Sequence, residues 1–127
     1  MYQGRMTIRN ALNKSLNVPA VKAFNAVGDK KVAEFAQGLG MPVEDTLNES
    51  TAIGGVETGF SPLDMAGAYA AFGNGGTYNE PITIEKIVLS DGTTIYADQK
   101  SETAMSPETA YIITDMLHTV MTDGTGK

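Results

Sequence analysis

Two segments of the sequence begin with serine followed directly by proline, and each then carries apolar residues at helical spacing. Ser61-Pro62-Leu63-Asp64 has the pattern of a capping box with proline at the first helical position, and Ser106-Pro107 repeats the serine–proline start. The serine oxygen can accept a hydrogen bond from a free N–H of the first turn, where proline loses nothing by lacking its own N–H. These signals predict one helix over residues 65–72 and a long final helix that ends at Asp123-Gly124.

Three shorter helices are predicted nearer the N-terminus from apolar residues at i, i+3 and i+4 spacing. They cover residues 7–13, 19–28 and 30–38. Thr7 and Asp29 are suited to cap the first and third of these helices, and Gly40 is suited to end the third. Between the first two helices, Pro19 should push Val18 out of the helical region, so the break is expected over residues 15–18.

A β-hairpin is predicted in the second half of the chain. The apolar residues Ile82, Ile84, Ile87 and Val88 precede an Asp91-Gly92 turn, and a second β-prone segment follows it. The sequence therefore predicts a fold that is mainly α with a small β-hairpin.

Charge and composition narrow the functions that are open to this chain. The formal net charge is −6 and the basic residues form no stripe, so we expect no nucleic-acid partner. There are no cysteines, and Glu44, Asp45 and Glu49 lack the spacing of a calcium loop, so no metal site or cofactor is expected. No apolar run is long enough to span a membrane, and we expect the chain itself to be soluble.

The one histidine, His118, lies on the final predicted helix with Tyr111, Asp115 and Thr122 on a polar face. We interpret it as a solvated residue near Asp115 and not as a catalytic base.

Three blocks of the sequence, in one order, resemble the transpeptidase domain of class A penicillin-binding proteins. The first is Asn10 to Ala20, in which Ser15-Leu16-Asn17 is similar to the family's Ser-x-Asn motif. The others are residues 61–78, similar to a helix-and-turn stretch of the family, and residues 110–127, similar to the helix that precedes its Lys-Thr-Gly strand. The resemblance therefore covers essentially the whole chain.

The resemblance implies a D,D-transpeptidase that cross-links peptidoglycan stem peptides through an acyl-serine intermediate and binds β-lactams. Ser15 would relay a proton to the leaving amine or toward the lysine beside the nucleophile. Asn17 would hydrogen-bond the peptide backbone of the substrate, because its side chain offers both a donor and an acceptor. The intact parent would be extracytoplasmic and anchored to a membrane, and no cofactor is implied.

The spacing of Ser15 and Asn17 restricts where they can act together. Residues i and i+2 diverge on a helix but point the same way in an extended or turn segment. The two side chains can therefore face one cleft only in a break between helices. A purely structural interpretation also fits this segment, with Ser15 ending one helix and Asn17 capping the next.

Two other motifs of the resembled family are missing from these residues. No serine has lysine three positions later, and Lys-Thr-Gly does not occur. We therefore expect residues 1–127 to be an internal segment of a transpeptidase domain that is inactive alone and self-associates through exposed apolar surface. The alternative is a non-catalytic helical binding module derived from the same fold.

Overall fold

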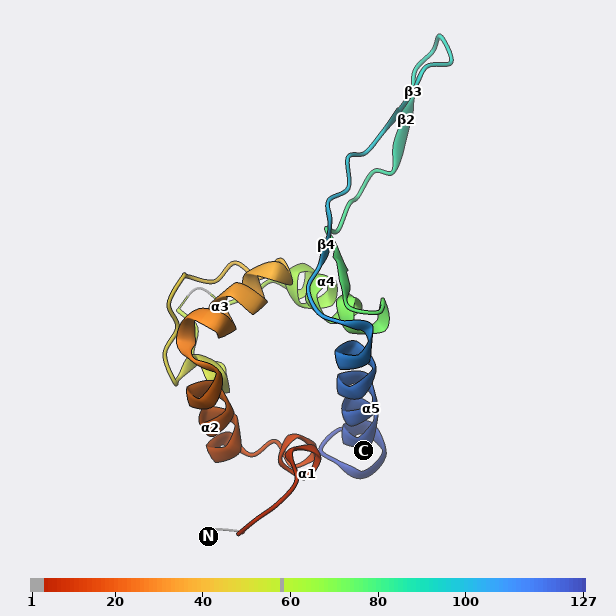
Figure 1. Cartoon of the computed structure of the whole chain (residues 1–127). Coiled ribbons are helices and arrows are strands. Elements are labelled where there is room, and N and C mark those ends of the chain that lie inside the picture. Colours follow the sequence, from red (N-terminus) through yellow and green to blue (C-terminus); the bar gives the residue numbers. More distant parts are fainter. Residues whose placement is uncertain (1–3, 58) are drawn as a thin grey trace.

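The fold is a set of α-helices with two small antiparallel sheets, in a computed structural model that describes residues 4–57 and 59–127. The helices are α1 (Ile8–Asn13), α2 (Asn17–Val27), α3 (Asp29–Gly38), α4 (Pro62–Gly73) and α5 (Pro107–Asp123), with a short 3₁₀ helix η1 (Thr51–Ile53). The strands are β1 (Thr77–Asn79), β2 (Lys86–Val88), β3 (Thr94–Tyr96) and β4 (Ser101–Thr103). The helices follow one another around an open ring, from which the hairpin of β2 and β3 projects (Figure 1). This confirms the predicted mainly α fold with a β-hairpin.

Serine caps start α4 and α5, as the sequence predicts. Ser61 Oγ accepts from the Asp64 N–H at 3.1 Å, while the Asp64 carboxylate accepts from the Ser61 N–H at 2.9 Å, which completes the capping box. Ser106 Oγ accepts from the Thr109 N–H at 3.2 Å. Thr7 caps α1 in the same way, with Asn10 as the donor.

Three predicted helix starts are wrong by a short distance. Helix α4 begins at Pro62, three residues before the predicted start, because Pro62 already has a helical conformation as its first residue. Helix α2 begins at Asn17, so Val18 is helical and Pro19 is the third helical residue. Proline is tolerated there because the N–H groups of the first turn have no partner inside the helix. Helix α3 is preceded by Gly28 as its N-cap, so Asp29 is its first residue and makes no side-chain cap. The predicted end of α3 is confirmed, because Gly40 has a left-handed φ of 72°.

The predicted hairpin is confirmed, and a second strand pair extends its base. Ile87 pairs with Ile95 in the antiparallel sheet of β2 and β3. Strands β1 and β4, which the sequence did not predict, pair with Tyr78 opposite Glu102 and close the stem of the hairpin. The turn is fixed by Gly92, whose N–H donates to the Leu89 carbonyl at 3.0 Å and whose φ is 88°.

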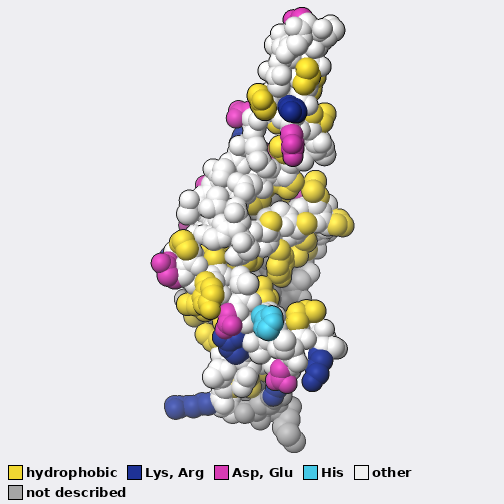
Figure 2. Space-filling view, turned by 90° about the vertical axis from the view of Figure 1, so that its right-hand side faces the viewer, with side chains coloured by type: hydrophobic (Ala, Val, Ile, Leu, Met, Phe, Trp, Pro, Cys, Tyr) yellow, Lys and Arg dark blue, Asp and Glu magenta, His cyan; other side chains and the backbone are white. Residues whose placement is uncertain are grey.

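The core is small and is built where α4, α5 and the end of α3 meet. Its buried members are Leu39, Ala68, Ala71, Met105 and Ala110. The small residues of α4 allow close packing, as predicted: a methyl group at Gly67 would lie 3.0 Å from Pro81 Cγ. Many large apolar side chains remain exposed, and they are spread over the α5 side of the molecule and along the hairpin (Figure 2).

Candidate active-site turn

The turn between α1 and α2 is a Schellman motif with serine at its left-handed position. The Ser15 N–H donates to the Leu12 carbonyl at 2.9 Å, and the Leu16 N–H donates to the Ala11 carbonyl at 3.0 Å. Ser15 has φ 51°, and it is the one non-glycine residue with positive φ in the described part of the chain. Glycine is the usual residue at such a position, because a Cβ there costs roughly 1–2 kcal/mol. A serine in this conformation places a hydroxyl at a backbone position that disfavours any side chain.

Asn17 lies just beyond this turn as the first residue of α2. Leu16, and not Asn17, is the N-cap of α2, and it makes no side-chain cap bond. Ser15 therefore ends a helix, as the purely structural interpretation of this segment predicts. Asn17 does not cap the next helix, so that part of the interpretation is wrong. The expected break between helices is confirmed, but it covers residues 14–16, so Asn17 is helical and not part of the break.

Ser15 and Asn17 line the same two surface grooves. The larger groove has a volume of about 940 Å³ and also includes Val18 and Lys22. The smaller groove has a volume of about 450 Å³ and is closed on one side by Ala52 and Ile53 of η1. The two residues thus line common grooves although Asn17 is helical, so the expectation that they could do so only within a break between helices is wrong.

Among the residues that the structure describes, none of those lining the two grooves has a carboxylate or an imidazole. Arg5 and Lys22 are the charged residues that line the larger groove, and the smaller groove has none. A serine hydroxyl becomes a nucleophile when a neighbouring base removes its proton. A carboxylate or imidazole base that could activate a serine in this way is absent from the described lining of both grooves.

Asn13 and the residues that follow α5 support this turn. Asn13 is buried, with 4% of its surface exposed, and its main-chain carbonyl accepts from the Thr125 N–H at 3.2 Å. Gly124 lies so close that a methyl group there would overlap the Asn13 carboxamide oxygen. No local sequence pattern predicts this junction, because the residues that form it are far apart in the chain.

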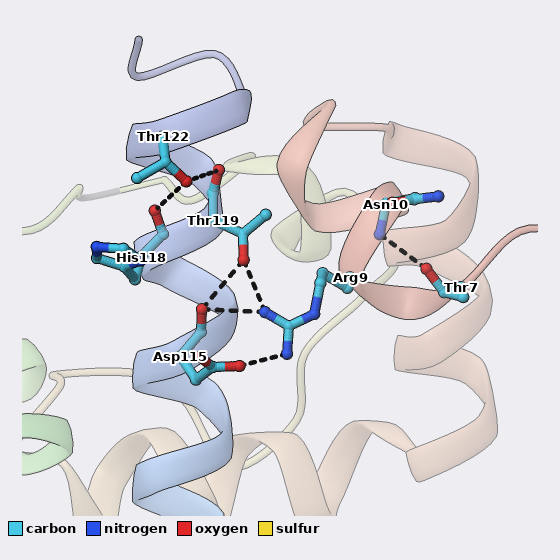
Figure 3. Close-up of polar contacts among 7 residues, drawn as sticks. All are labelled: Thr7, Arg9, Asn10, Asp115, His118, Thr119 and Thr122. Atoms are coloured by element: carbon cyan, nitrogen blue, oxygen red, sulfur yellow. Dashed lines mark hydrogen bonds and ion pairs between the residues drawn. The ribbon is translucent and has the colours of Figure 1, made fainter.

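One helical turn before Asn13, Arg9 joins α1 to α5 (Figure 3). Its guanidinium donates to the Asp115 carbonyl at 3.0 Å, to the Thr119 hydroxyl at 2.7 Å and to the Asp115 carboxylate at 2.5 Å. The charged partner of Asp115 is therefore Arg9, which lies on another helix, and not His118. His118 is exposed, as predicted, and its main-chain carbonyl accepts from the Thr122 hydroxyl.

The groups with shifted pKa values lie away from this turn. Burial raises the pKa of Tyr78, and hydrogen bonds from Ser61 lower the pKa of Asp64. Hydrogen bonds also lower the pKa values of Asp91 and Glu108 in the hairpin turn and at the start of α5.

The described residues include no cluster of three or more His, Asp or Glu side chains that could hold a metal ion. None of the helices in this part of the chain has both the length and the apolar character of a membrane-crossing helix.

Comparison with known families gives one consistent match. Residues 1–127 match the family described as "Penicillin binding protein transpeptidase domain". Among curated proteins, the chain is 50% identical over 129 residues to penicillin-binding protein 1A/1B of Bacillus subtilis, covering 99% of this chain and 14% of that protein. It is 40% identical over 131 residues to penicillin-binding protein 1A of Streptococcus pneumoniae, covering 99% of this chain and 18% of that protein.

A solved structure agrees with these sequence matches. The crystal structure of penicillin-binding protein 1A from Haemophilus influenzae superimposes with a TM-score of 0.79 at 28% identity, covering all of this chain and 24% of that one. The chain thus spans less than a quarter of the length of each of these three proteins. Together with the Ser15–Asn17 turn, these matches show that the chain belongs to the transpeptidase domain family of the class A penicillin-binding proteins.

Proposed function

We propose that this chain is a segment of a serine-type D,D-transpeptidase domain and supplies the Ser-x-Asn part of its active site. The observation that carries the proposal is the placement of Ser15 and Asn17 on one groove, with Ser15 in a left-handed turn that glycine would fit more easily. Strain of this kind gathers at functional sites, where the surrounding structure maintains it.

The proposed reaction has two steps, over which no net proton is gained or lost. A serine outside these 127 residues attacks an amide carbonyl of a peptidoglycan stem peptide, so that an ester forms, the amide bond breaks and the hydroxyl proton passes to the leaving amine. In the second step the amine of another stem peptide attacks the ester, a new amide bond forms, the ester C–O bond breaks, and the proton lost by the amine passes to the serine oxygen. Ser15 relays the proton in each step, and general acid–base groups of this kind typically contribute about 10²–10⁴-fold to the rate.

Asn17 would position the substrate. Its carboxamide can donate to a peptide carbonyl and accept from a peptide N–H at the same time, as an extended backbone in the groove requires. β-Lactams would bind the same site as mimics of the stem peptide.

The remaining catalytic groups must come from outside these residues, since neither Ser-x-x-Lys nor Lys-Thr-Gly occurs here. We propose that residues 1–127 lie between those motifs in a longer protein that is extracytoplasmic and membrane-anchored. The second candidate, a non-catalytic helical binding module, would have neither motif in the flanking sequence. Reading the coding sequence on both sides of this segment separates the two candidates.

Labelling with a fluorescent penicillin tests the proposal directly. We expect no covalent adduct on the 127-residue chain, and one adduct per molecule on the longer protein that contains it. Denaturing gels and mass spectrometry of the labelled peptides locate the adduct. An adduct on Ser15, or on any other serine of this chain, would show that the nucleophile has been misplaced, and an unlabelled longer protein would favour the binding module.

A further inference from the structure

We propose that Asn13 is a positioning residue for the Ser15–Asn17 turn, and that it holds this turn through its contacts with Gly124 and Thr125 beyond α5. The inference rests on the proposed function of Ser15. Asn13 lines neither groove. The new element is that the conformation of the active-site turn depends on the residues at the end of α5.

Asn13 joins the two segments through both its main chain and its side chain. Its carbonyl accepts from the Thr125 N–H at 3.2 Å. Its carboxamide Oδ1 is buried and has no hydrogen-bond partner among the described residues. That oxygen lies against the Cα of Gly124, because a methyl group at position 124 would overlap it. A Cα–H group is a weak partner for an oxygen, so the position of Asn13 is set mainly by close packing.

The other side of this junction is itself fixed. The N–H groups of Gly124 and Gly126 both donate to the Val120 carbonyl, each at 3.1 Å, so the chain folds back over the last turn of α5. The residues on both sides of Thr125 are therefore hydrogen-bonded to the last turn of α5.

Ser15 depends on support of this kind. Its left-handed conformation is unfavourable for a residue with a Cβ, and such conformations persist where the surrounding structure fixes them from several sides. Two hydrogen bonds within the turn hold Ser15 from the side of α1. The bond from Thr125 to Asn13 holds the last residue of α1, two positions before Ser15, from the side of α5. If this bond is disturbed, the hydroxyl of Ser15 should turn away from the groove.

The test uses the longer penicillin-binding protein that contains this segment and measures its rate of acylation by a fluorescent penicillin. Gly124→Ala inserts a methyl group into the space of the Asn13 oxygen, and Asn13→Ala removes that oxygen. Gly73→Ala is the matched control, because a methyl group there meets no atom within 4 Å. We expect Gly124→Ala to slow acylation about tenfold or more, since a displacement of about 1 Å can cost on the order of 100-fold. Asn13→Ala should slow it less, because the main-chain bond remains, and Gly73→Ala should not slow it.

Combination with Ser15→Ala separates positioning from loss of fold. If Asn13 and Gly124 act through Ser15, their substitutions should slow acylation much less in a protein that already carries Ser15→Ala. Thermal unfolding identifies the temperature range in which every variant is folded. If Gly124→Ala does not fold, Asn13→Ala alone tests whether Asn13 positions the turn. An undiminished effect in the Ser15→Ala background, or unchanged acylation in the variants, would overturn the inference. Normal acylation of Ser15→Ala itself would instead remove the proposed role of Ser15.

Discussion

Arg9 of α1 donates hydrogen bonds to both the carboxylate and the main-chain carbonyl of Asp115 in α5, although the two residues are 106 positions apart in the chain (Figure 3). The same guanidinium also reaches the hydroxyl of Thr119, one turn further along α5. Through these contacts, α1, which leads into the Ser15 turn, is bound to α5, whose C-terminal end packs against Asn13.

Arg9→Ala should lower the free energy of unfolding of this chain by about 1 kcal/mol or less. The side chains of Arg9 and Asp115 are 39% and 51% exposed, so water screens much of their attraction. Arg9→Lys should lose most of the same amount, because an ammonium group lacks the planar fork that contacts several acceptors together. Urea unfolding followed by circular dichroism measures both effects. Lys31→Ala, an exposed cation on α3, should change the unfolding free energy by less; an equal change would contradict the role of Arg9.

Gly40→Ala should destabilise the chain by roughly 1–3 kcal/mol. Gly40 has φ 72°, and a methyl group there would overlap the ring and hydroxyl of Tyr78, so both the backbone and the packing oppose a side chain. The matched control is Gly38→Ala in the last turn of α3, where a methyl group meets nothing within 4 Å. The control should be neutral or slightly stabilising, because alanine favours helix more than glycine does. Thermal unfolding compares the two, and equal midpoints would refute the expected clash with Tyr78.

Ser61→Ala should raise the pKa of the Asp64 carboxyl toward its ordinary value. The Ser61 hydroxyl, and then the Ser61 N–H, hold that pKa low by donating to the carboxylate. Because the pKa is lower in the folded chain than in the unfolded one, the stabilisation is present above about pH 4 and is lost as the pH falls through the folded pKa. An NMR titration of Asp64 measures the shift. Ser106→Ala is the control, since it removes the cap of α5 and should leave Asp64 unchanged.

Local sequence signals predicted the helices and the hairpin because each signal acts within a few residues. The Ser61 capping box, the Gly40 helix end and the Asp91-Gly92 turn all concern neighbours in the chain. The pairing of β1 with β4 was missed, because each strand has three residues and its partner lies beyond the hairpin. The start of α2 was placed too late, because Pro19 is compatible with any position in the first helical turn.

The candidate site was predictable only in part, because sequence signals act over a few residues and some of its contacts join distant parts of the chain. The Ser-x-Asn spacing led to Ser15 and Asn17, and the structure places both on the same grooves. The left-handed conformation of Ser15 gave no signal, because serine is not the residue expected there. Asn13 and Arg9 gave none either, since their partners near residues 115–125 are brought to them only by the fold.

We expect the 127-residue chain to self-associate in solution through the exposed face of its hairpin. Ile87 and Ile95 lie opposite each other in the sheet and are 49% and 50% exposed. Replacing both by threonine keeps the β-branched shape and removes apolar surface, so the apparent mass should fall toward that of a monomer. Thr94→Ser, on the other face of the hairpin, should have no such effect. Light scattering after size-exclusion chromatography measures the mass, and a strict monomer at high concentration of the unsubstituted chain would contradict the expectation.

The catalytic role of the Ser15 hydroxyl is tested by comparing Ser15→Gly with Ser15→Ala in the longer penicillin-binding protein. Glycine suits the left-handed turn better than serine does, so Ser15→Gly should leave the thermal midpoint unchanged or raise it, while it removes the hydroxyl. Both variants should be acylated by a fluorescent penicillin about 10²–10⁴-fold more slowly than the unsubstituted protein. Acylation of a stably folded Ser15→Gly protein at the normal rate would show that the Ser15 hydroxyl does not act in catalysis.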